Sequence, residues 1–120
     1  MNEIREIVEV IDKLTELTQN EHISWVKEEP GNLMTSENNI DFIYLAEYQE
    51  DKIRLYLEEY KFYIDEDDGY WKSHIIIELI DGDGNALWRF PETGNSWDLL
   101  NAIKYKDARV GDFLKRIRSA

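Results

Sequence analysis

The apolar residues near the start of the chain repeat with the period of an α-helix. From Glu3 to Thr18 they return at three- and four-residue steps and form a single stripe. The stripe contains Ile4, Ile7, Val8, Ile11 and Leu14. Most acidic side chains of this segment lie off the stripe, and those in the first turn suit the positive end of the helix dipole. The pattern predicts an amphipathic helix that ends near Asn20.

Between residues 22 and 90 the apolar pattern changes to the alternation of β-strands. We expect strands over residues 23–27, 40–48, 53–64, 70–80 and 86–90, and a further short strand over 33–36. Within 53–64, apolar residues occupy odd positions up to Leu57 and even positions from Tyr60. Such a change of phase predicts a β-bulge near Glu58 and Glu59.

Helical spacing returns after Pro91. Ser96 is a suitable N-cap for a helix that starts at Trp97, with Trp97, Leu100 and Ile103 expected on its inner face. A second helical piece is expected after Asp107, and Gly111 argues against one continuous helix. Its apolar residues are Val110, Phe113, Leu114 and Ile117.

The order of these elements predicts an α+β fold in one domain that spans residues 1–120. Short turns connect the expected strands, which favours antiparallel pairing because parallel pairing needs long crossovers. We therefore expect an N-terminal helix, an antiparallel meander of about five to six strands, and a C-terminal helix or helix pair packed on one face of the sheet.

Charge changes the picture of possible partners. The 120 residues include 26 acidic and 14 basic side chains, a net charge of −12. Because neutralising phosphates needs Lys and Arg, we expect neither a nucleic-acid partner nor a membrane partner. The charge is uneven, since residues 1–95 carry 23 acids and 8 bases, whereas residues 96–120 carry 3 acids and 6 bases. The basic stretch 104–118 is either a contact surface or an internal counterweight.

The sequence lacks the residues and motifs that several kinds of catalytic and metal-binding sites require. The absence of cysteine excludes disulfides, thiolate metal sites and cysteine nucleophiles, and it fits a cytoplasmic location. Phosphate-binding loops and the hydrolase nucleophile motif are also absent. His22 and His74 have no metal-ligand spacing, and Ser73 beside His74 would point to the opposite face of a strand. We expect no catalytic residue and no cofactor, which favours a binding protein over an enzyme.

The loop from Asp81 to Asn85 is one candidate site. Asp81, Asp83, Asn85 and Glu92 occupy the first, third, fifth and twelfth positions of a calcium-loop frame. However, Ala86 occupies the position of the turn glycine, and the flanking segments are strand-like. A hairpin turn is therefore favoured. A metal- or ligand-binding module with a carboxylate site at Asp81, Asp83 and Asn85 remains an alternative.

The second candidate site combines tyrosines with the densest acidic run. Tyr56 and Tyr63 lie on strand faces opposite their apolar neighbours, so a sheet covered on only one side would expose them. The predicted partner-binding residues are Tyr56, Tyr63, Asp65, Glu66, Asp67 and Asp68.

These features together favour one function. We expect a small, acidic cytoplasmic binding or regulatory protein, inhibitor- or immunity-like in composition, that engages a basic protein partner through an acidic, tyrosine-rich sheet face. A monomer and a homodimer are both compatible with the sequence, and a homo-oligomerising domain is a further alternative.

Overall fold

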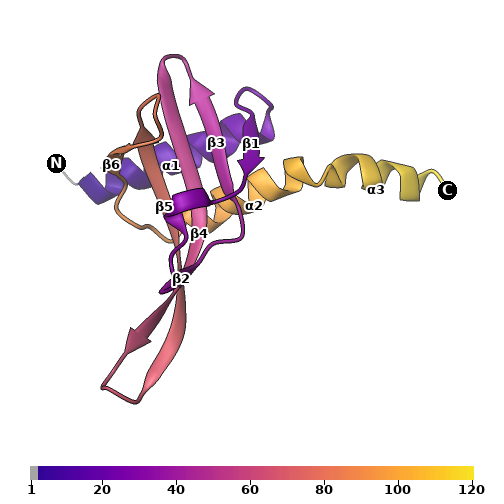
Figure 1. Cartoon of the computed structure of the whole chain (residues 1–120). Coiled ribbons are helices and arrows are strands. Elements are labelled where there is room, and N and C mark those ends of the chain that lie inside the picture. Colours follow the sequence, from indigo (N-terminus) through magenta and orange to yellow (C-terminus); the bar gives the residue numbers. More distant parts are fainter. Residues whose placement is uncertain (1–2) are drawn as a thin grey trace. The chain divides into compact units, whose positions relative to one another are not determined.

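The computed structural model describes residues 3–120 and confirms an α+β fold with terminal helices and an antiparallel sheet (Figure 1). Its elements are α1 (Glu3–Gln19), β1 (Trp25–Glu28), the 3-10 helix η1 (Gly31–Leu33), β2 (Asn38–Asn39), β3 (Ile43–Tyr48), β4 (Asp51–Tyr63), β5 (Gly69–Ile80), β6 (Ala86–Arg89), α2 (Ser96–Asp107) and α3 (Val110–Arg118). No helix within residues 3–120 is both long and apolar enough to cross a membrane.

The chain divides into two compact units. The helical unit contains the residues up to Trp25 and those from Thr93 onward, and the sheet unit is Val26–Glu92. A single domain over residues 1–120 stays a prediction. Each unit has its own internal contacts.

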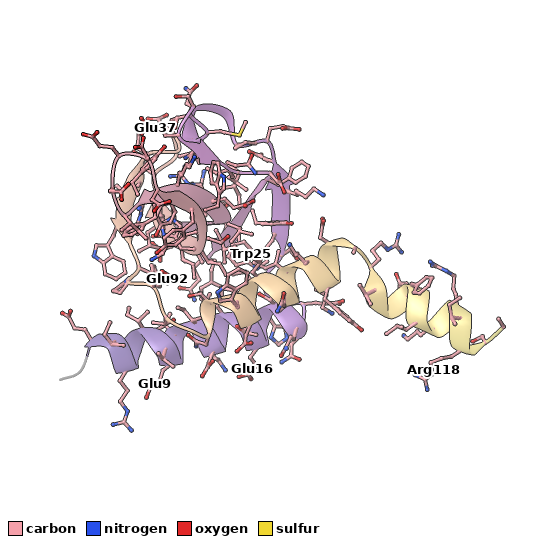
Figure 2. The ribbon with its side chains drawn as sticks, turned by 90° about the horizontal axis from the view of Figure 1, so that it is seen from below. Glu9, Glu16, Trp25, Glu37, Glu92 and Arg118 are labelled. Carbon is pink, nitrogen blue, oxygen red and sulfur yellow. The ribbon has the colours of Figure 1, made fainter. Side chains whose placement is uncertain are left out.

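In the helical unit, α1 packs against α2. Ile11 and Leu14 of α1 are buried, as the period of α1 predicts, and Leu99 and Ile103 of α2 are buried as well. The outward side of α1 is acidic, and Figure 2 shows Glu9 and Glu16 pointing away from the helix.

Asn95 fixes the start of α2. Its Nδ2 donates hydrogen bonds to the carbonyl oxygen of Val8 and to Oδ1 of Asp12, both at 2.8 Å. Asn95, not Ser96, is the N-cap residue, so the predicted cap is wrong by one position. Trp97 is 41% exposed, and the prediction that it lies on the inner face is therefore also wrong. The buried side of α2 is formed by Leu99, Leu100 and Ile103.

The sheet unit is built around the long β4–β5 hairpin. The strand order is β1-β3-β4-β5-β6, and β2 pairs with β4 beside this path. The β4–β5 pairs run without a shift from Lys52 opposite Ile80 to Tyr63 opposite Gly69. The predicted bulge near Glu58 and Glu59 is therefore wrong.

The apolar pattern of β4 changes phase because its environment changes along the strand. Residues 53–56 are buried whichever face they occupy, whereas residues 61–63 are exposed on both faces. A change in which face is apolar then needs no extra residue. The strand proposed for residues 33–36 is also wrong, because the pairing with β4 is made by Asn38–Asn39 after η1.

A buried ionic network lies on the same face of the hairpin as Tyr56. Arg54 and Glu78 are opposite each other in β4 and β5, and they are only 6% and 2% exposed. Nη2 of Arg54 lies 2.9 Å from Oε1 of Glu78, and Nη1 donates to the carbonyl oxygen of Gly84 at 2.8 Å. Arg89 approaches the second oxygen of Glu78 at 3.3 Å. Buried charges require such complete pairing, because each loses its hydration.

Removing the shared carboxylate should therefore destabilise the fold strongly. In the Glu78→Gln variant, Arg54 stays buried without its counter-ion, and we expect a loss of about 3–5 kcal/mol in the free energy of unfolding. Arg89→Gln removes an exposed partner and should cost less than about 1 kcal/mol. Urea denaturation measures both values, and equal small losses would show that the network is not important for stability.

Candidate functional site

β4 and β5 continue beyond the other strands as a two-stranded arm. The pairing of β3 with β4 ends at Tyr56, and that of β2 ends at Tyr60. Within the part of the chain that the structure describes, residues 61–71 have no third strand beside them; we call these residues the arm. Figure 1 shows the arm as the far end of the β4–β5 hairpin.

The tip of the arm is an ordered acidic loop. Oδ1 of Asp65 accepts hydrogen bonds from the backbone N–H groups of Asp67 and Asp68, both at 2.9 Å. The N–H of Ile64 donates to the carbonyl oxygen of Asp68 at 2.8 Å and closes the loop. Asp65 therefore shapes the turn, and the carboxylates of Glu66, Asp67 and Asp68 form its exposed negative surface.

Aromatic side chains occupy both faces of the arm. On one face the rings of Phe62 and Tyr70 pair at 5.6 Å between centroids, and Nζ of Lys72 lies 4.3 Å from the centre of Phe62. On the other face Tyr63 lies across Gly69, where an added Cβ would come within 2.9 Å of the ring. Trp71 is on this second face and is 57% exposed.

The arm exposes several large apolar and aromatic side chains. Its exposed large apolar residues are Phe62, Tyr63, Ile64, Tyr70 and Trp71. A two-stranded hairpin without a covering layer is only marginally stable in water. Several large apolar side chains exposed close together are typical of an interaction site.

A groove of about 530 Å³ lies at the base of the arm. Within it, Nε2 of His74 lies 2.6 Å from Oε1 of Glu58, and the Tyr60 ring lies 4.7 Å from the His74 ring. Nδ2 of Asn38 donates to Oε2 of Glu58 at 2.6 Å and to the carbonyl oxygen of Leu33 at 3.0 Å. Glu58 therefore links β5, β4 and the segment around β2.

The hydrogen bonds in this groove stabilise the ionised form of Glu58. Burial raises the pKa of Glu58, but the hydrogen bonds from His74 and Asn38 and the charges of His74 and Arg89 together lower it, and the net pKa lies below the ordinary 4.5. Both carboxylate oxygens of Glu58 have partners, so the group orients His74 and holds Asn38 at the base of the arm. Ser73 pairs with Glu59 on the opposite face, so it does not meet His74 in a nucleophile–base arrangement.

The predicted partner-binding residues separate into two groups. Tyr63 and the run from Asp65 to Asp68 come together on the arm, and their role in binding stays a prediction. Tyr56 is 3% exposed and packs with Ile40 and Ile76. The expectation that Tyr56 lies on an open face is wrong, because the segment that contains η1 and Ile40 covers that face. Burial, with a further contribution from Glu78, raises the pKa of Tyr56 to about 12.

The loop Asp81–Asn85 connects β5 and β6. Oδ1 of Asp81 accepts hydrogen bonds from the N–H groups of Asn85 and Asp83, both at 2.9 Å, and the bond from Asn85 is the main cause of the lowered pKa of Asp81. Gly84 adopts a φ of 87°, which glycine tolerates best. Among residues 3–120, no group of three or more His, Cys, Asp or Glu side chains could hold a metal ion. A metal site at Asp81, Asp83 and Asn85 stays a prediction.

Two features of the site were missed from the sequence, although a signal for both was present. They are the Phe62–Tyr70 pair with Trp71, and the Glu58–His74 pair. Counting outward from the acidic turn that the sequence predicts places Phe62 opposite Tyr70 and Glu58 opposite His74. A bulge near Glu58 and Glu59 would have disturbed this register only at the Glu58–His74 pair.

Comparisons with known proteins give no matching family model, no matching curated protein and no matching solved structure. Function is therefore inferred from the arm and the groove themselves.

The lowered pKa of Glu58 predicts a specific pH dependence of stability. A carboxyl whose pKa is lower in the folded state stabilises the fold above its ordinary range, and this contribution is lost as the pH falls through the folded pKa. We expect Glu58→Gln to be less stable than the wild type at neutral pH, and the difference to shrink below about pH 4.5. Urea unfolding at several pH values measures this difference.

Glu59→Gln is the matched control, because Glu59 makes one longer hydrogen bond, at 3.4 Å, with Asn39. Its stability difference from the wild type should be small and should change less between pH 3 and 5. If the Glu58→Gln difference stayed constant over this range, the hydrogen bonds to Glu58 would not favour its charged form.

Proposed function

We propose that this chain is a small acidic binding protein that docks its arm onto a basic, partly apolar surface of another protein. The observation that carries this proposal is the set of exposed aromatic residues on both faces of the arm, around a loop of four carboxylates. Aromatic side chains are enriched at the centres of protein interfaces, where they contribute most of the binding energy.

Charge supports the choice of a basic partner. The chain carries a net charge of −12, and the tip concentrates Asp65, Glu66, Asp67 and Asp68. Such a tip attracts a cationic surface over a distance and raises the rate of association. It repels nucleic acids and anionic membranes for the same reason.

The base of the arm supports a pre-organised mode of binding. Glu58 connects His74 of β5 to Asn38 of β2, and Asp65 orders the tip. A surface that is already ordered loses less conformational entropy when it binds. An inhibitor- or immunity-like role in the cytoplasm is consistent with this mode, and the absence of cysteine supports that location.

The proposal predicts that binding depends on Trp71. The probe is a short synthetic amphipathic peptide of leucine and lysine, and its binding is followed by fluorescence anisotropy. Trp71→Ala should weaken binding by about tenfold or more, the effect of losing about 1.4 kcal/mol. The double variant Glu66→Gln/Asp67→Asn should bind more weakly at low salt and depend less on salt.

Matched controls separate the arm from the general acidity of the chain. Trp88→Ala removes a tryptophan that is 48% exposed on β6, and Glu28→Gln/Glu29→Gln removes two exposed charges near β1. Both controls should bind the peptide like the wild type. If arm variants and controls lost affinity equally, the peptide would be responding only to net charge and the arm would not be the docking site.

A further inference from the structure

α3 presents a second exposed apolar surface, and it is chemically opposite to the arm. None of residues 110–118 is buried. Phe113, Leu114 and Ile117 repeat at helical spacing and are 51%, 44% and 58% exposed. Within the helical unit, Figure 2 shows α3 continuing beyond the pair formed by α1 and α2, with Arg118 near its far end.

The backbone conformation of Arg109 separates α3 from α2. Arg109 adopts a left-handed conformation with a φ of 54°, which is unusual for a residue other than glycine. Arg109 lies between the end of α2 and the start of α3, and its guanidinium forms an exposed ion pair at 2.9 Å with Asp112 in the first turn of α3. The helical conformation is therefore interrupted at Arg109, and α3 is a helix distinct from α2.

A helix as short as α3 normally depends on packing for its stability. Isolated helices under about 12 residues are marginal in water, and an amphipathic helix gains most of its stability by burying its apolar face. The apolar face of α3 is instead exposed. Its polar side is basic, with Lys115, Arg116 and Arg118 in the last turns.

We propose that the arm of a second copy of this chain covers the apolar stripe of α3. This inference rests on the proposed function, because it uses the arm as the docking element and names a basic partner for it. The loop with four carboxylates would approach Lys115, Arg116 and Arg118, while Trp71 and Tyr70 would pack against Phe113 and Ile117. Opposite charges and exposed apolar side chains are thus available on both surfaces.

Charge also argues against a second α3 as the occupant of the stripe. Two copies of α3 packed face to face would bring two basic helices together, and like charges at an interface oppose association. The arm is the part of this chain that combines exposed aromatic residues with a dense acidic loop.

The proposed contact is heterologous, since it joins two different surfaces. A pair joined by one such contact would keep one arm and one α3 unoccupied, so association continues until a ring closes or a chain of copies forms. This property allows a stringent test with two complementary variants. Tyr70→Ala/Trp71→Ala removes the arm surface, and Phe113→Ala/Ile117→Ala removes the stripe while keeping good helix formers in α3.

Analytical ultracentrifugation over a range of concentrations is the measurement. We expect the wild type to associate in a salt-sensitive manner, and each double variant alone to associate about tenfold more weakly or not at all. An equal mixture of the two variants should form dimers, because one variant supplies an intact α3 and the other an intact arm. The mixture should stop at dimers, since the remaining surfaces are both defective.

Several results would overturn the inference. A wild type that is monomeric at every concentration, or a mixture that stays monomeric, would exclude the contact between copies. If the arm variant associated as well as the wild type while the α3 variant did not, the stripe would be covered by another α3. Leu87→Ala, which removes an apolar residue that is 67% exposed on β6, is the matched control and should associate like the wild type.

A second pair of variants tests the same contact without removing apolar side chains, in case the first variants unfold. Lys115→Glu/Arg118→Glu changes only exposed charges on α3 and should also weaken association, whereas the same reversal at Arg5 and Lys13 of α1 should not. Circular dichroism checks that all variants are folded. Unchanged association after the α3 reversal would contradict the role of charge in this contact.

Failure of this inference and failure of the proposed function give different results. The Phe113→Ala/Ile117→Ala variant keeps its arm, so it should still bind the leucine–lysine peptide. If the wild type is monomeric but peptide binding still depends on Trp71, only the contact between copies is excluded. If peptide binding does not depend on Trp71, the arm is not a docking element and both proposals fail.

Discussion

The unbroken register between β4 and β5 is the constraint on which the sheet unit depends. It places Arg54 opposite Glu78, so that a buried charge finds its counter-ion, and it places Glu58 opposite His74 at the base of the arm. The same register pairs Phe62 with Tyr70. Because side chains alternate between faces with a period of two, a shift by one residue would break all three pairs at once. The ionic core and the exposed site are therefore two ends of one structural element.

The local elements of this fold were largely predictable from the sequence. The stripe of α1, the alternation of the longer strands and the acidic turn from Asp65 to Asp68 are local signals, and the corresponding elements are present, whereas the short strand expected over 33–36 is not. The bulge was an error of a different kind. The change in the apolar phase reflects a change from buried to exposed surroundings along β4, not an irregularity of the backbone.

Burial of particular side chains was harder to predict than the elements. Tyr56 is covered by Ile40 and by the segment around η1, and nothing local to β4 indicates that an irregular segment will lie there. The start of α2 shows the same difficulty. Asn95 is the N-cap residue, and its side chain forms hydrogen bonds with Val8 and Asp12, which are distant in sequence. Helical periodicity likewise located the stripe of α3 but could not show that it would remain exposed.

The period-two geometry of the arm has a consequence for how its length can vary. Adding one residue to each strand beyond Tyr60 would turn the distal aromatic residues to the opposite side of the hairpin, apart from the effect of twist. Adding two to each strand would restore their facing and carry the acidic tip roughly 7 Å farther from the sheet. The length of the arm and the direction of its aromatic side chains are thus linked. The arm can become longer or shorter without turning these side chains only in steps of two residues per strand.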